Sequence, residues 1–155
     1  MSFVHGERRW MVGTFAIALL WLGLLLGVSF LATPAKFLAP SLTLPVALDV
    51  GRHTFALFNK IEWILSIGLL FTMLVGARAW LGVAAAVTAA AAVLAETVWL
   101  LPFLDQRVGM IIAGQQPPAS SHHYLYIAVE LLKLVALVVV AGTAARRLMS
   151  QASNL

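Results

Sequence analysis

Four ionisable side chains lie inside long apolar stretches of this sequence: Glu62, Glu96, Glu130 and Lys133. A charged group at the centre of a membrane helix costs about 2.5–3.5 kcal/mol on insertion scales, so such residues usually have a reason to be retained. A carboxylate beside a lysine in a medium of low dielectric constant can exchange a proton when its partner changes. Acidic side chains also concentrate cations. These residues therefore favour proton exchange or cation binding.

Helical spacing predicts that these side chains face one another. Counted from the expected cytoplasmic ends of their helices, the three glutamates reach a similar depth, and Lys133 lies one turn deeper. Two polar stripes have helical periodicity. They are His122, Tyr126, Glu130 and Lys133 on one helix, and Arg52, Asn59, Glu62 and Ser66 on another.

We therefore expect a polar pocket that opens to the outer side of the membrane. Glu130 and Lys133 would form its floor, and Glu62 and Glu96 its walls. Its mouth would carry His53, His122, His123, Arg52 and Asp105. The candidate binding residues are Glu62, Glu96, Glu130, Lys133, Arg52, Asn59 and Tyr126. In a second interpretation the cluster has no ligand, and its ion pairs only fasten the helices together.

The histidines His53, His122 and His123 are candidate metal ligands. Neutral imidazoles near carboxylates suit zinc, copper or iron, and a haem could be held between His53 and one of the other two. Against a transition-metal site, the sequence has no HxxxH or ExxH spacing and no paired Glu-x-x-His motif of the di-iron bundles. A transition metal and haem thus stay alternatives to protons and simple cations.

The composition requires that membrane helices position these residues. Of the 155 residues, 62% are hydrophobic and 10% are charged, which leaves too little polar surface to cover a globule in water. The net charge of +4 is dispersed, without the basic and aromatic stripe of a nucleic-acid-binding surface. The sequence contains no cysteine, which excludes disulfides, thiolate metal sites and thiol redox catalysis.

The hydropathy pattern predicts an all-α, four-helix membrane bundle that forms a single domain over residues 1–155. The four spans are expected at about 10–32, 56–77, 79–101 and 124–145. Arg78 alone separates the second and third spans, which indicates a tight hairpin. Short interfacial helices are expected in both outer loops, over residues 44–59 (continuing into the second span) and 105–113. Trp21 lies deeper than the other tryptophans and is expected to pack in the core.

Lys and Arg near the span ends predict the orientation. The denser group is Arg8, Arg9, Arg78, Arg146 and Arg147, and the sparser group is Lys36, Arg52, Lys60 and Arg107. The denser side should be cytoplasmic, with both termini inside. A bacterial inner membrane is the expected location, because no organellar or export signal is evident.

Three strings carry a resemblance to a known group. They are Leu101-Pro102-x-Leu104-Asp105-x-Arg107, Gly114-Gln115-x-Pro117-Pro118-x-Ser120 and His123-x-x-Tyr126-x-x-x-Glu130-x-x-Lys133. Together with Gly27-x-x-Phe30 and Pro34-x-x-Phe37, they resemble small four-span bacterial membrane proteins with the layout of the transmembrane protein 205-like group. The resemblance implies a four-helix bundle and supplies no biochemistry.

Two functions from different classes follow from these observations. In the first, the pocket binds or passes a cation, proton or metal, and the protein forms a homo-oligomer, since four helices are few for a transporter. In the second, the chain is an accessory or assembly subunit of a larger membrane complex without its own chemistry. An enzyme is less favoured, because no nucleophile–base pair, phosphate loop or cofactor motif is present and no catalytic residue is predicted.

Overall fold

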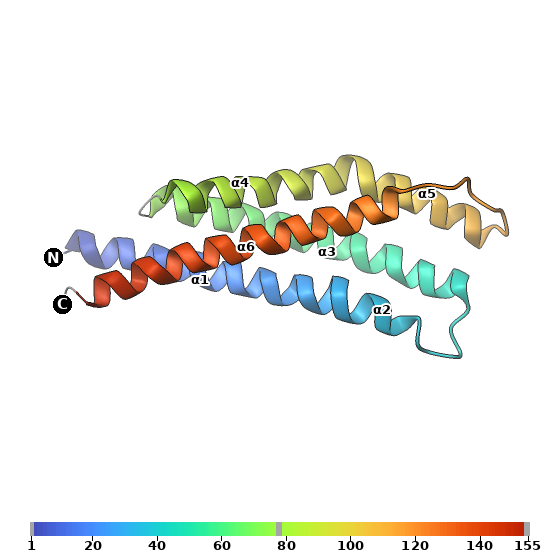
Figure 1. Ribbon diagram of the computed structural model, residues 1–155, viewed down its shortest axis with the longest axis horizontal. Helices are drawn as coiled ribbons and strands as arrows, with labels where there is room; N and C mark the ends of the chain where they lie inside the picture. Colours follow the sequence, from blue (N-terminus) through green and yellow to red (C-terminus); the bar gives the residue numbers. More distant parts are fainter. Residues whose placement is uncertain (1, 77–78, 154–155) are drawn as a thin grey trace.

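A computed structural model describes residues 2–76 and 79–153 and shows four long helical rods packed side by side (Figure 1). The first rod joins α1 (Ser2–Leu25), η1 (Leu26–Ala32) and α2 (Thr33–Lys36). The second is α3 (Leu44–Val75), and the fourth is α6 (His122–Ala152). The third joins α4 (Trp80–Ala95), η2 (Glu96–Leu100) and α5 (Leu101–Ile112). The predicted all-α four-helix bundle is confirmed.

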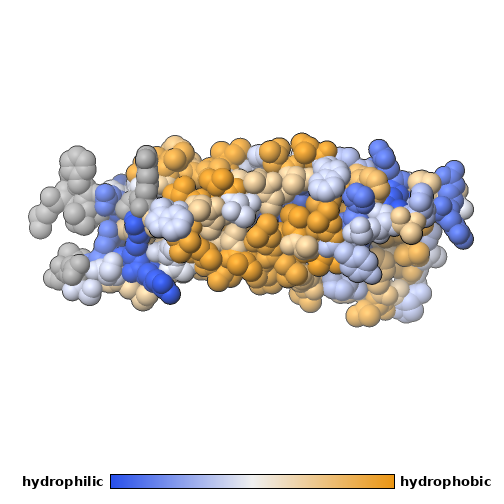
Figure 2. Space-filling view, turned by 45° about the horizontal axis from the view of Figure 1, so that its top comes forward, coloured by the Kyte–Doolittle hydropathy of each residue, from blue (hydrophilic) through white to orange (hydrophobic). Residues whose placement is uncertain are grey.

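All four rods are long and apolar enough to cross a membrane. The four candidate spans, of which the first is counted from Gly6 to Lys36, contain 31 to 33 residues each, so at 1.5 Å per residue they are about 46–50 Å long and exceed the ~30 Å hydrocarbon core. On the face shown in Figure 2, hydrophobic side chains gather over the middle of the bundle and hydrophilic ones toward both ends. An apolar exterior of this kind contacts lipid, and the fold is that of a helical membrane protein.

The bundle has two different ends. The longer connections, residues 37–43 and 113–121, lie together at one end, which we call the loop end (Figure 1). The chain begins and finishes at the opposite end, which we call the terminal end (Figure 1). The second and third rods also meet there, where α3 finishes at Val75 and α4 starts at Trp80. Arg78, expected between them, lies outside the described residues.

The expected loop helices belong to the rods. Residues 44–59 form the first turns of α3, continuous with the second span as expected. Residues 105–112 continue the third rod as part of α5, where a separate short surface helix was expected. The position of these turns relative to a membrane surface stays a prediction.

The core depends on small and large residues that face each other. The alanine-rich α4 buries one stripe, formed by Ala85, Ala86, Ala89 and Ala92. Small side chains let α4 approach the other helices closely. Fully buried Trp21, Leu69, Leu137 and Val140 belong to the same hydrophobic core as Ala85, Ala86 and Ala89. This apolar packing fills the bundle between the charged cluster described next and the terminal end.

Candidate functional site

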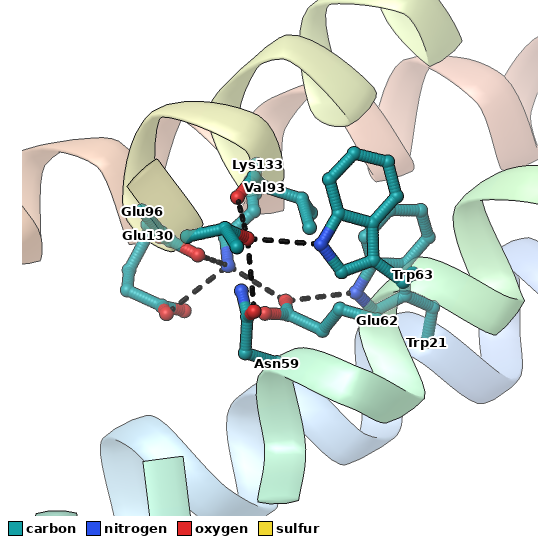
Figure 3. Close-up of polar contacts among 9 residues, drawn as sticks. Trp21, Asn59, Glu62, Trp63, Val93, Glu96, Glu130 and Lys133 are labelled. Atoms are coloured by element: carbon teal, nitrogen blue, oxygen red, sulfur yellow. Dashed lines mark hydrogen bonds and ion pairs between the residues drawn. The ribbon is translucent and has the colours of Figure 1, made fainter. Parts of the chain in front are cut away.

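A buried ammonium group contacts three carboxylates inside the bundle (Figure 3). Lys133 Nζ donates hydrogen bonds to Glu62 Oε1 at 2.6 Å, Glu96 Oε2 at 2.7 Å and Glu130 Oε1 at 3.1 Å. The ammonium has three N–H groups, and each one has a carboxylate acceptor. The side chains are 0–2% exposed. We call these four residues the acidic cluster.

All four rods contribute to this arrangement. Glu62 comes from α3, Glu96 from η2, and Glu130 and Lys133 from α6. The first rod supplies Trp21, whose indole Nε1–H donates to Glu62 Oε1 at 3.0 Å. Trp21 was expected only to pack in the core, and it does so, but it also binds the cluster. An indole N–H inside an apolar helix needs an acceptor, and this is the signal that points to such a role.

A π-helical turn positions Glu96. In η2 the N–H of Leu101 donates to the carbonyl of Glu96, five residues earlier. Pro102 follows directly, and proline removes one helical hydrogen bond and collides with the carbonyl four residues before it. A wider turn relieves this conflict, and η1 lies in the same way just before Pro34. Such π turns are frequent at functional sites.

A second series of hydrogen bonds, which we call the Asn59–Thr97–Trp63 chain, lies against the cluster (Figure 3). Trp63 Nε1 donates to Thr97 Oγ1 at 2.9 Å. The Thr97 hydroxyl lies 2.9 Å from Asn59 Oδ1 and 2.7 Å from the carbonyl of Val93. The sequence predicted Asn59 as a binding residue but gave no signal for Thr97, because a threonine in a helix commonly bonds only its own backbone.

Three buried polar atoms beside the Lys133 contacts have no hydrogen-bond partner among the described residues. They are Glu96 Oε1, Glu130 Oε2 and Asn59 Nδ2. The first two accept hydrogen bonds, and the amide nitrogen donates them. Buried polar atoms are normally paired, so unpartnered atoms at one place mark a site that can receive a proton or another polar group.

Aromatic rings cover the loop-end side of the cluster. Tyr126 is buried beside Glu130, one turn earlier on α6, and its ring packs edge-on against Phe55 with centroids 5.3 Å apart. The Phe58 ring lies 6.0 Å from Lys133 Nζ. Tyr126 thus lies where the sequence placed it, next to the charged residues.

The predicted mouth residues do not touch the cluster in their described contacts. Arg52 Nε pairs with Asp49 at 2.8 Å, and Arg52 Nη1 lies 3.7 Å from Asp105, which links α3 to α5 at the loop end. These pairs are partly exposed. A cavity of about 20 Å³, room for a single water, lies near the terminal end between Met11 and Thr143. An opening from the cluster to the outer side stays a prediction.

The three histidines predicted as metal ligands, His53, His122 and His123, have no described contact with the acidic cluster. His53 is exposed and its Nδ1 lies 2.9 Å from the Asp49 carbonyl. His122 Nδ1 lies 2.6 Å from Ser120 Oγ, and its ring stacks on Phe103. His123 is exposed. A metal or haem held by these histidines stays a prediction.

Among the described residues, one set of three possible metal ligands lies close together. The ligand oxygens of Glu62, Glu96 and Glu130 fall within 4.8 Å of one another. Carboxylates alone suit magnesium, calcium or manganese rather than the transition metals expected for histidine. However, Lys133 Nζ binds all three and occupies the position that such an ion would need. The three carboxylates and Lys133 therefore form one buried polar site.

Comparisons of the chain with protein-family models, curated proteins and solved structures found no match. The resemblance to the transmembrane protein 205-like group therefore rests on the sequence pattern alone. The structure shows four helices that can span a membrane and a buried charged cluster among them.

Proposed function

We propose that this is a small integral membrane protein whose acidic cluster reversibly binds protons delivered from the loop end. The observation that carries the proposal is the ratio of charges in the buried site. Three carboxylates surround one ammonium, so the fully ionised cluster has a formal charge of −2. A net charge buried in a medium of low dielectric constant is strongly unfavourable, and up to two protons remove it.

Protons fit this site better than a metal ion. A metal would have to displace Lys133 Nζ from three hydrogen bonds of 2.6–3.1 Å. A proton needs no such displacement, because Glu96 Oε1 and Glu130 Oε2 are unpartnered among the described residues and can each take one. The amide of Asn59 points toward the acidic cluster (Figure 3), and its Nδ2 is also without a partner among the described residues. Proton binding therefore uses the carboxylate oxygens of Glu96 and Glu130 that do not bind Lys133.

The side chains next to the cluster are more polar toward the loop end than toward the terminal end, although the buried aromatic rings of Phe58 and Tyr126 also lie on the loop-end side. Toward the terminal end, the cluster is followed by the apolar layer of Leu65, Leu69, Leu137 and Val140, which are 0–9% exposed. Toward the loop end lie Asn59 and Tyr126, and beyond them the partly exposed pairs of Arg52. This gradient favours binding and release at one face over permeation through a single copy of the bundle.

We further propose that the loop end faces the outside of a bacterial inner membrane. Arg8, Arg9, Arg146 and Arg147 of the denser Lys and Arg group lie toward the terminal end (Figure 1), which would make both termini cytoplasmic. A homo-oligomer or a larger membrane complex would surround the apolar exterior. In this setting the cluster would respond to the proton concentration outside the cell.

Infrared spectroscopy tests the proton site, because the C=O stretch of a protonated carboxyl group is separate from the bands of carboxylate. We expect this band to change in wild-type protein when the pH is varied. Glu96→Gln and Glu130→Gln should each remove part of the change. Glu7→Gln, at an exposed position, is the matched control and should leave it intact.

Two results would contradict the proposal. If the variants at 96 and 130 change the spectrum no more than Glu7→Gln does, the cluster keeps a fixed protonation state. It would then serve only to fasten the helices, as expected for an accessory subunit. If magnesium, calcium or manganese alters the carboxylate bands at low concentration in wild type but not in Glu130→Gln, the ligand is a metal ion.

A further inference from the structure

The Asn59–Thr97–Trp63 chain has two alternative hydrogen-bond arrangements. The Thr97 hydroxyl has one proton but two acceptors within reach, Asn59 Oδ1 at 2.9 Å and the Val93 carbonyl at 2.7 Å. It can donate to only one of them at a time. Trp63 Nε1 occupies one lone pair of the same oxygen, at 2.9 Å, and leaves the other free.

In the first arrangement, Thr97 donates to Asn59 Oδ1. The Asn59 Nδ2–H groups then face the cluster, where they can donate to an ionised carboxylate. The unpartnered Nδ2 and the unpartnered Glu96 Oε1 and Glu130 Oε2 are the atoms concerned. This arrangement suits a cluster that has lost a proton.

In the second arrangement, Thr97 donates to the Val93 carbonyl and its free lone pair accepts from Asn59. The amide has turned over, so its Nδ2 now bonds Thr97 and its Oδ1 faces the cluster. That oxygen can accept a hydrogen bond from a protonated carboxyl. The turn needs little space, because the oxygen and nitrogen of a side-chain amide have nearly the same size.

We propose that Asn59 is a positioning residue that turns over when the acidic cluster gains or loses a proton, and that Thr97 transmits this change to Trp63. The inference rests on the proposed proton site. It adds a route by which the protonation state of the acidic cluster affects Trp63. The titratable side chains at this place are Glu62 on α3, Glu96 on η2, and Tyr126, Glu130 and Lys133 on α6, and the Asn59 amide points toward the acidic cluster that four of them form (Figure 3). From α1 the cluster meets Trp21, which does not titrate.

The change reaches Trp63 because the Thr97 hydroxyl, which accepts the hydrogen bond from Trp63 Nε1, changes its other hydrogen bonds. When Thr97 donates to Asn59, its oxygen accepts one hydrogen bond, from Trp63. When Thr97 accepts from Asn59 as well, two donors share that oxygen, and the bond from Trp63 weakens. Trp63 is half-buried between α3 and η2, so the strength of this bond affects how these two elements pack.

Nuclear magnetic resonance of the indole N–H groups tests this relay in the intact protein. The chain has five tryptophans, and Trp63→Phe assigns the Trp63 signal. We expect the Trp63 resonance to move with pH at the midpoint of the carboxyl infrared band. Asn59→Leu should abolish this movement. Trp21 donates directly to Glu62, so its resonance should still move in Asn59→Leu and serves as the internal control.

A matched pair at position 97 gives an independent test that does not depend on the Asn59 variant. Thr97→Ser keeps the hydroxyl and should preserve the Trp63 response, whereas Thr97→Val has the same shape without it and should lose the response. If Trp63 follows pH equally in both, the relay is wrong. If Trp21 and the carboxyl band respond in wild type while Trp63 does not, the relay is again wrong but the proton site stands. If none of them responds, the proton site itself is wrong.

Discussion

Replacing Lys133 with methionine is expected to lower the free energy of unfolding by about 3–5 kcal/mol. The change removes the ammonium that binds Glu62, Glu96 and Glu130, all of which are buried. Carboxylates without a counter-charge are then left in the core. The loss should shrink in acid buffer, where the carboxylates become neutral. Denaturation in mixed micelles measures the effect, and Leu132→Met, at the exposed neighbouring position, is the control.

A combined variant separates the charge from the shape of the lysine. Lys133→Met together with Glu62→Gln, Glu96→Gln and Glu130→Gln removes the ammonium and all three carboxylates at once. It should recover a large part of the stability lost in Lys133→Met, because neutral amides need no counter-charge. If Lys133→Met alone is as stable as Leu132→Met, the buried ion pairs do not stabilise the fold and the account of the cluster is wrong.

Truncating Trp21 to alanine should cost about 3–5 kcal/mol. The side chain is fully buried, and its removal leaves a cavity among Leu25, Leu69 and Leu137. It also removes the N–H donor to Glu62 Oε1. Trp21→Phe keeps most of the ring packing and loses only the hydrogen bond, so it should cost about 1 kcal/mol plus a smaller packing loss. Thermal unfolding of the detergent-solubilised protein measures both.

The exposed Trp80 provides the matched control for Trp21. It is 80% exposed, so Trp80→Phe should change stability by less than about 0.5 kcal/mol. If Trp21→Phe has no larger effect than Trp80→Phe, the indole does not support the cluster. If Trp21→Phe is as damaging as Trp21→Ala, the hydrogen bond rather than the packing dominates.

The membrane helices could be predicted from sequence because their signal is local. A run such as residues 10–32 has no charge, and only a helix satisfies its backbone within lipid. In the structure, α3 and α6 also include polar sequence outside the predicted spans at 56–77 and 124–145. Prolines 34 and 102 were visible, but whether a proline gives a kink or a π turn depends on the neighbouring helices.

The centre of the site was predictable for a related reason. Glu62, Glu96, Glu130 and Lys133 stand out because charge is rare in such runs, and helical spacing placed them together. Trp21 and Thr97 are ordinary residues of membrane helices, so their hydrogen bonds could be identified only in three dimensions. The closed, ammonium-centred geometry likewise depends on lysine reaching all three glutamates, which sequence spacing does not specify.

The most direct test of the central claim changes pH on one face of the membrane at a time. Protein inserted in lipid vesicles with known orientation would be followed by the carboxyl infrared band. We predict that the band responds to a pH step on the face that carries the loop end and not to one on the face that carries the termini. An equal response to both faces would contradict one-sided access, and no response to either would contradict a proton-binding cluster.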